Sequence, residues 1–342
     1  MDRPTFSVLD LAPVAGGAGS ADALRNSVEL ARVTERLGYH RYWVAEHHGM
    51  PGIAASSPAV LAAHIADATS TVRVGAGGVM LPNHPPLVVA EQFGMLEALH
   101  PGRIDLGIGR APGTDPMTAR ALRREAEPVS PEDFFRQIVE LMGLFDGSLP
   151  PEHPYARIFP VPAPGNVPGF WVLGSSAFSA GVAADLGLPF AFAHHLGAAN
   201  LLPALAAYRS RYQPSQWLDR PYVLVAVSGL CAGTDEEARF LAAPWKLALL
   251  QLRQGRPSTV PSPESAARYD YNDAEREYVK GLPEIVGGPD RFRTELDALI
   301  EAAHPDEVMV TTATHRAPDR VRSYELIAGL YGLRPQVEEP KT

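Results

Sequence analysis

The stretch "RYWVAEHH", residues 41–48, ends an apolar segment with three adjacent ionisable side chains, Glu46, His47 and His48. Successive strand residues point to opposite faces, so His47 and His48 cannot both face the inside of a barrel while strand geometry persists. A chelating pair would favour i, i+2 spacing, so we predict no metal site. An imidazole at a strand end can transfer protons near neutral pH. Structural hydrogen bonds are the alternative role for either histidine.

Glycines follow two further apolar segments. "VGAGGVM" places Gly75 and Gly77 on one face of a strand, and "IDLGIGR" places Gly107 and Gly109 on one face of the next. Glycine weakens a strand interior unless another body approaches the backbone closely. The pattern predicts space for a flat ligand against both strands, and tight packing between the strands is the alternative.

Groups that bind anions follow two strands. Arg110 comes directly after Gly109, and a guanidinium there suits phosphate or carboxylate, although a surface ion pair would also fit. In "FWVLGSSAFSAG" an apolar segment ends at Ser175 and Ser176, and a helix opens at once, with Ser179 one turn on. Serine hydroxyls and free backbone N–H groups at a helix start form a phosphate site.

Short apolar strands alternate with helical patterns along nearly the whole chain, which is typical of a parallel sheet covered on both faces. Predicted helices include 21–38, which Gly38 would end, one that Ser57 would cap with Pro58 at its first position, 86–99, 131–146 and 317–331. Eight βα units favour an α/β fold of the (β/α)8 TIM-barrel type. The expected strands are 5–14, 41–46, 71–81, 103–109, 169–175, 188–193, 222–230 and 307–312.

Two longer segments interrupt this alternation, 111–168 after the fourth strand and 231–288 after the seventh. Loops that follow barrel strands project from the carboxyl end, where barrel enzymes build their active sites. We therefore predict a single barrel domain over 1–342 whose two insertions cover a substrate, with ordinary elaborated loops as the alternative.

Composition narrows the function classes. The 342 residues carry a net charge of −9 and no long basic run, which argues against nucleic acid or an anionic membrane as partner. The only cysteine, Cys231, cannot form an intrachain disulfide. We find no signal peptide and no apolar run long enough to span a bilayer, so we expect a cytoplasmic protein.

Several of these stretches together resemble the bacterial luciferase-like flavin-dependent monooxygenases, in their single-chain branch. They are "YWVAEHH", "VRVGAGGVMLPNHPPLVVAEQFGMLEALHPGRIDLGIGRAPG" and "LGSSAFSAGVAADLGLPFAFAHH". The similarity extends from "SVLDLAPV" near the start to "SYELIAGL" near the end.

The resemblance implies a barrel that binds reduced FMN at the carboxyl ends of its strands. It implies that His47, followed by His48, acts in proton transfer near the flavin. Gly77 and Gly78 would lie against the isoalloxazine, often through an unusual peptide bond. The residues implied at the flavin phosphate are Ser175, Ser176, Ser179 and Arg110. Two departures stand out: Gly109 occupies the place of a reactive cysteine of luciferase and Ser175 that of a glutamate, and light emission is not implied.

The expected function is oxygenation of a small organic substrate by O2 and reduced FMN, which a separate flavin reductase supplies. An aldehyde is one candidate substrate. The alternatives are an F420-dependent dehydrogenase on the same barrel, a non-catalytic flavin-binding protein and, more remotely, a metal hydrolase. Apolar faces of the barrel helices are compatible with a homodimer.

Overall fold

A closed parallel barrel forms the centre of the computed structural model, which describes residues 3–123 and 130–335. Strands β1 to β7 pair in chain order, and β9 closes the barrel between β7 and β1. The strands are β1 (Thr5–Asp10), β2 (Arg41–Val44), β3 (Arg73–Met80), β4 (Ile104–Gly109), β5 (Gly169–Gly174), β6 (Phe190–Ala193), β7 (Val223–Cys231), β8 (Glu284–Gly287) and β9 (Glu307–Thr311).

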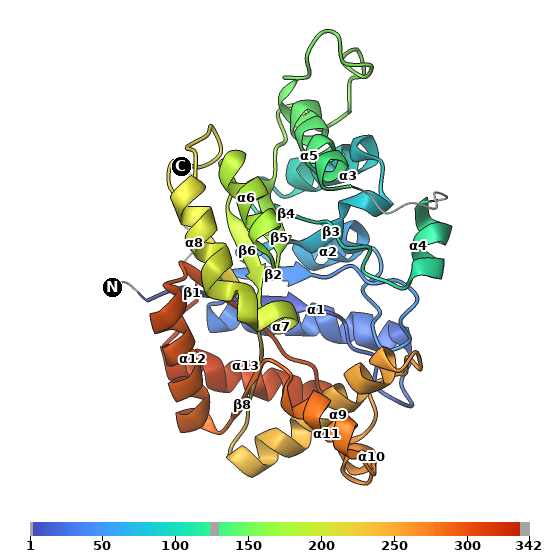
Figure 1. Cartoon of the computed structure of the whole chain (residues 1–342), viewed down its shortest axis with the longest axis vertical. Coiled ribbons are helices and arrows are strands. Elements are labelled where there is room, and N and C mark those ends of the chain that lie inside the picture. The colour runs from blue at the N-terminus through green and yellow to red at the C-terminus, as the bar shows by residue number, and fades with distance from the viewer. Residues whose placement is uncertain (1–2, 124–129, 336–342) are drawn as a thin grey trace.

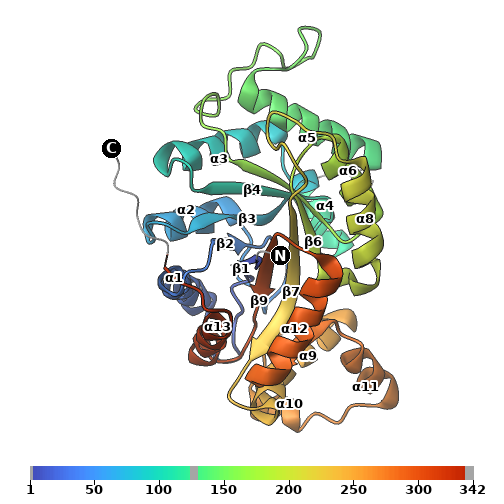
Figure 2. The same cartoon turned by 90° about the vertical axis from the view of Figure 1, so that its left-hand side faces the viewer.

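Helices surround the barrel (Figures 1 and 2). They are α1 (Ser20–Leu37), α2 (Pro58–Asp67), α3 (Pro86–Leu99), α4 (Pro116–Arg123), α5 (Pro131–Asp146), α6 (Ala177–Asp185), α7 (His194–Gly197), α8 (Leu201–Arg211), α9 (Asp235–Arg253), α10 (Pro263–Ala267), α11 (Asp273–Lys280), α12 (Pro289–Ala303) and α13 (Ala317–Tyr331). In the part of the chain that the structure describes, no helix is both long and apolar enough to cross a bilayer.

The predicted (β/α)8 barrel is confirmed, and all eight predicted strands are present. A ninth strand, β8, was not predicted. Its sequence "EIVG" holds only two large apolar residues and follows a proline, so it gives too short a pattern to stand out. It pairs with the end of β7, beyond the point where β7 leaves β9, and so extends the barrel wall on that side.

Helix ends follow the sequence signals with one exception. Gly38 ends α1 with φ of 91°, a backbone conformation that glycine adopts at little cost. Pro58 begins α2 as predicted, but the Ser57 side chain forms no capping hydrogen bond. Ser176 does cap α6, because its hydroxyl accepts from the Ser179 N–H at 3.4 Å.

The middle of the barrel is filled by apolar side chains. Trp43 and Trp171 meet edge to face, with ring centroids 5.1 Å apart. They pack with the other inward-facing residues of this layer, Leu9, Ala45, Ala191, Leu224, Ala226 and Met309. This layer separates the two ends of the barrel from each other.

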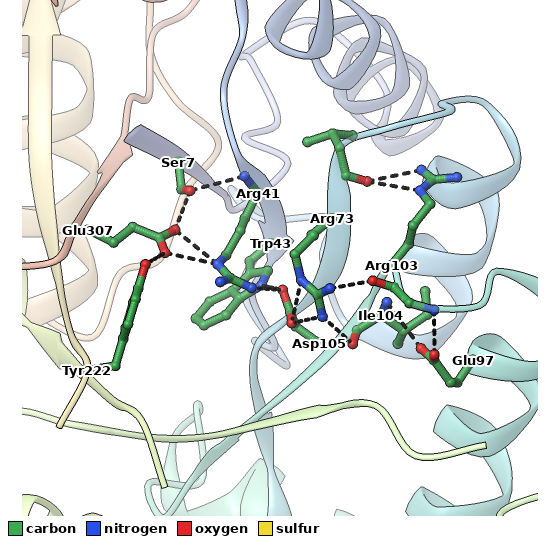
Figure 3. A network of polar contacts seen from close by, with 12 residues as sticks. Ser7, Arg41, Trp43, Arg73, Glu97, Arg103, Ile104, Asp105, Tyr222 and Glu307 are labelled. Carbon is green, nitrogen blue, oxygen red and sulfur yellow. Dashed lines mark hydrogen bonds and ion pairs between the residues drawn. The ribbon is translucent and has the colours of Figure 1, made fainter. Parts of the chain in front are cut away.

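The amino end of the barrel is closed by a network of buried charges (Figure 3). Arg41 lies between two acids: its Nη1 is 2.7 Å from Asp105 and its Nε is 3.0 Å from Glu307. Arg73 binds the other oxygen of Asp105 at 2.6 Å, and Tyr222 donates to Glu307 at 3.0 Å. Burial alone would raise the pKa of Asp105, but the two guanidiniums hold it below its usual value.

The two long segments place most of their helices at opposite ends of the molecule. The segment after β4 carries α4 and α5, and α5 packs on α3 at one end of the molecule. The segment after β7 carries α9, α10 and α11, which lie at the opposite end (Figures 1 and 2). The two segments therefore cannot both lie over one cavity through these helices.

Candidate active site

Glu46 is a fully buried carboxylate just past the end of β2. Its Oε1 is 2.8 Å from His48 Nε2 and 2.9 Å from His84 Nε2, and its Oε2 accepts from the Met80 N–H at 3.0 Å. Burial alone would raise the pKa of Glu46, but these hydrogen bonds, that of His84 above all, keep it below its usual value. The carboxylate therefore ties the end of β2 to the end of β3 and holds His48 in place.

His47 points the other way, into a cavity at the carboxyl end of the barrel. Its Nδ1 is 3.2 Å from the Gly113 carbonyl oxygen. A carbonyl can only accept, so Nδ1 carries the proton. Burial lowers the pKa of His47, which favours the neutral imidazole with a free lone pair on Nε2. The two histidines, which follow β2 beyond its end at Val44, thus diverge: His48 contacts Glu46, and His47 faces the cavity.

Gly113 makes this arrangement possible. Its φ is +66°, a conformation that side chains other than glycine rarely adopt, and a Cβ there would lie 2.7 Å from the Glu46 carbonyl oxygen. Glycine thus lets the loop after β4 approach the end of β2 closely enough to orient His47. This loop opens the first long segment, although no described residue of that segment lines the cavity.

A second histidine of the cavity, His195, was not predicted. It follows β6, and its Nδ1 is 3.1 Å from the Ala226 carbonyl oxygen on β7. Burial lowers the pKa of His195 to about 4, so this imidazole is also neutral, with the proton on Nδ1. The sequence carried a signal, because "FAFAHH" repeats the pattern of an apolar strand ending in a histidine pair that "RYWVAEHH" shows.

The cavity has a volume of about 600 Å³. We call floor the polar lining residues that come from the barrel strands β7 and β9 and from the residues just after β2 and β6, namely His47, His195, Ser228 and Thr311. The segment after β7 adds apolar lining through Trp245, Leu249 and Leu252 of α9, Tyr278 of α11, and Leu282 and Pro283 beside β8, and further apolar residues come from other loops, among them Leu11, Ile53 and Leu196. The segment 231–288 therefore lines the cavity, whereas none of the described residues of 111–168 does so.

A candidate anion site lies at the start of α6. Ser176 Oγ is 3.4 Å from Ser179 Oγ, and Ser175 is half-buried next to them. The Arg110 guanidinium stacks over the Phe178 ring in the same turn, 4.9 Å from its centroid. Within the described residues Arg110 forms no ion pair. The predicted serines and Arg110 are thus brought together at the start of α6, where a positive charge and the first N–H groups of a helix favour an anion.

The anion site and the cavity share a wall but are distinct. A Cβ on Gly197 would lie 3.1 Å from Ser175 Cβ, and Asn200 Nδ2 donates to the Ser175 carbonyl at 3.3 Å. His195 of the same short segment faces the cavity. The segment 194–200 therefore has the serines on one side and the cavity on the other.

The glycines of β3 and β4 meet the neighbouring strand closely, contrary to the prediction of space for a ligand at Gly75 and Gly107. A Cβ on Gly75 would come within 2.2 Å of Asp105 O, and one on Gly107 within 2.3 Å of Ala76 O. These glycines allow β3 and β4 to pack closely, and they do not leave space for a flat ligand. A Cβ on Gly77 or Gly78 would also fall within 3 Å of protein atoms. The peptide bond between Gly77 and Gly78 is cis, and only Gly77 of this pair is partly exposed.

No metal centre is present in the described ranges: no group of three or more His, Cys, Asp or Glu side chains there is arranged to hold an ion. His48 and His84 both use their Nε2 atoms on Glu46 instead.

A barrel with histidines and an anion site at the carboxyl ends of its strands occurs in many enzymes, and comparison with known proteins narrows the choice. The family model for luciferase-like monooxygenases matches residues 5–329. The chain belongs to this family. It is therefore a flavin-dependent monooxygenase of the luciferase-like type.

Relatives within the family are similar along their whole length. A luciferase-like monooxygenase of Escherichia coli (strain K12) is 42% identical over 94% of this chain and 95% of its own. An N-acetyl-S-alkylcysteine monooxygenase of Bacillus subtilis (strain 168) is 35% identical over 94% of this chain and 97% of its own.

Solved structures share the fold. The crystal structure of apo-MsnO8 superposes with a TM-score of 0.89 at 37% identity, covering 98% of this chain and all of that one. Two more distant barrels each have a TM-score of 0.69. They are the oxygenating constituent of 3,6-diketocamphane monooxygenase in complex with FMN, at 20% identity over 99% of this chain and 100% of its own, and an F420-dependent secondary alcohol dehydrogenase, at 13% identity over 96% and 99%. At these identities only the fold is comparable.

Proposed function

We propose that this chain is the oxygenase of a two-component system. A separate reductase supplies reduced FMN, and the chain uses it with O2 to oxygenate a small organic substrate in a reducing, cytoplasmic setting. The observation that carries the proposal is the position of a histidine-floored cavity next to the anion site of α6, with the segment 194–200 between them.

The residues at the start of α6 suit the flavin phosphate. The Ser175, Ser176 and Ser179 hydroxyls, the first N–H groups of α6 and the Arg110 guanidinium provide hydrogen-bond donors and positive charge for a dianion. The backbone at Gly77 and Gly78 would lie beside the ring system. Bound reduced FMN would supply the electrons that activate O2.

His47 would hold or move a proton at its Nε2. The bond from Nδ1–H to the Gly113 carbonyl fixes the ring and the tautomer, so that the free lone pair faces the cavity. His48 would act through position: its bond to Glu46 anchors the backbone next to His47. The apolar wall from α9 and α11 would keep water from the reacting atoms.

The direct test combines binding and oxygen incorporation. We expect reduced FMN to bind more tightly than oxidised FMN, and F420 to bind weakly. With a flavin reductase and ¹⁸O2, a panel of alkyl thioethers and aldehydes should give at least one product carrying a single ¹⁸O atom. Preferential binding of F420 without oxygen uptake would instead indicate a dehydrogenase. Tight flavin binding without turnover of any substrate would indicate a flavin-binding protein.

A homodimer remains part of the proposal, since apolar side chains are exposed on α3 and α5, among them Met95, Leu99 and Val139. Light scattering in solution would measure it.

A further inference from the structure

Several polar side-chain atoms at the floor of the cavity have no hydrogen-bond partner in the described chain. In the described chain, neither His47 nor His195 has a hydrogen-bond partner at Nε2. Neither of these nitrogen atoms is completely buried. Both atoms are therefore open to the cavity that the two residues line. The Ser228 and Thr311 hydroxyls, which lie side by side on β7 and β9, are likewise without a partner there.

Backbone geometry fixes what the two imidazoles can do. Each Nδ1 faces a carbonyl oxygen, that of Gly113 for His47 and that of Ala226 for His195. Because those oxygens only accept, each Nδ1 must carry the proton, and each neutral ring presents an acceptor lone pair at Nε2. The cavity thus offers two hydrogen-bond acceptors from opposite parts of the barrel, β2 and β6.

The charged groups around the cavity do not change this picture at the floor. Glu284 is paired with Lys246. Arg253 stacks on Tyr278, 4.6 Å from the ring centroid, and Glu277 is exposed. Above the floor, the wall of α9 is apolar through Trp245 and Leu249.

We propose that this cavity binds a neutral organic molecule through a hydrogen-bond-donating group, a hydroxyl or an amide N–H, whose proton His195 Nε2 accepts while an apolar chain lies along α9, and that His47 Nε2 is a second acceptor in the same cavity. The inference rests on the proposed function in taking the cavity as the place of the oxygen acceptor, and it adds His195 as a residue that selects the substrate. A carboxylate would face two lone pairs and be disfavoured. An unhydrated aldehyde also lacks a donor, so it ranks below an alcohol of the same length.

The test uses matched probes of the full chain without flavin. 1-Octanol and heptyl methyl ether have the same number of heavy atoms, and only the alcohol donates. Calorimetry at pH 7.5 should show the alcohol binding about five- to tenfold more tightly than the ether, the range expected for one net hydrogen bond. Octanoate should bind more weakly than the alcohol.

Variants of His195 test whether this side chain, and not a general change in the protein, gives the preference for the alcohol. His195→Asn can keep the bond to the Ala226 carbonyl but lacks the second acceptor, so the preference for the alcohol should fall several-fold while ether affinity is unchanged. His195→Gln places an amide oxygen near the Nε2 position and should restore part of it. His100→Asn, a substitution outside the cavity, should leave both affinities as in the wild type.

The inference is overturned if the alcohol and the ether bind equally, if octanoate binds most tightly, or if the preference survives in His195→Asn. Failure of the proposed function gives a different result: the chain would still prefer the alcohol but would bind no reduced FMN.

Discussion

The two ends of this barrel treat buried polar groups in opposite ways. At the amino end Arg41 and Arg73 are matched by Asp105 and Glu307, and the network is closed by hydrogen bonds (Figure 3). At the carboxyl end His47 and His195 each bind a backbone carbonyl through Nδ1, and within residues 3–123 and 130–335 their Nε2 atoms have no partner. The amino end thus pairs its charges within the protein, and the carboxyl end keeps polar atoms available for a ligand.

The largest effect that we expect is a loss of turnover when His47, at the carboxyl end of the barrel, is replaced. His47→Asn can still donate to the Gly113 carbonyl but lacks the acceptor at Nε2. Turnover should fall by about 10²- to 10⁴-fold, the usual contribution of a proton-transfer group, while the urea midpoint stays nearly unchanged. Oxygen uptake under saturating reduced FMN measures the rate, with His100→Asn as the control. Full activity in His47→Asn would remove this histidine from the reaction.

At the amino end of the barrel we expect substitutions to lower stability. Arg41→Met leaves Asp105 and Glu307 buried with less compensation and should lower the free energy of unfolding by about 3–5 kcal/mol. The control is Arg25→Met, whose ion pair with Asp22 is exposed and should contribute less than about 1 kcal/mol. Urea unfolding measures both variants. Equal losses would mean that the buried network does not distinguish the amino end.

The third prediction concerns pH. The folded pKa of His195, about 4, lies below its unfolded value of about 6.5, so the unfolded chain binds more protons between these values. This contribution to stability is complete above about pH 6.5 and declines as the pH falls toward 4, by at most about 3 kcal/mol. Unfolding free energies of the wild type and His195→Asn should therefore converge or cross between pH 7.5 and 5. Parallel pH profiles for the two proteins would contradict the neutral imidazole.

The smallest effects that we expect concern Ser176, whose roles in capping α6 and in binding flavin can be measured separately. Ser176→Ala should cost about 1 kcal/mol by removing the cap of α6, and it should also weaken reduced FMN binding several-fold. Ser130→Ala is the matched control, because Ser130 caps α5 in the same way, accepting from the Asp133 N–H at 3.0 Å. It should show the same loss of stability with unchanged flavin affinity. Identical flavin affinities in both variants would argue against a phosphate at α6.

The fold was largely predictable from the sequence, because strands buried on both faces give long apolar segments and their order determines the barrel. The strand β8 was missed because four residues carry too little pattern. The site was predictable in part. His47 and the serines directly follow predicted strands, so the sequence alone indicates at which end of the barrel they lie. The Gly113 and Ala226 carbonyls that orient the histidines are distant in the chain, so the sequence does not indicate these contacts.

The glycine pattern shows the limit of such reasoning most clearly. Gly75 and Gly107 suggested an approaching ligand, but the approaching body is the neighbouring strand, since the missing side chains would collide with Asp105 and Ala76 backbone atoms. Strand pairing brings these atoms together, and a single sequence does not show which strand contact is tight.

The central claim is that the carboxyl end of the barrel holds two neutral imidazoles with free Nε2 atoms. ¹⁵N NMR of histidine-labelled full-length protein at pH 7.5 tests it directly, with assignments from His47→Asn and His195→Asn. We predict, for both residues, a protonated Nδ1 and an Nε2 with the shift of an unprotonated nitrogen. An imidazolium, or a proton on Nε2 of either ring, would contradict the account.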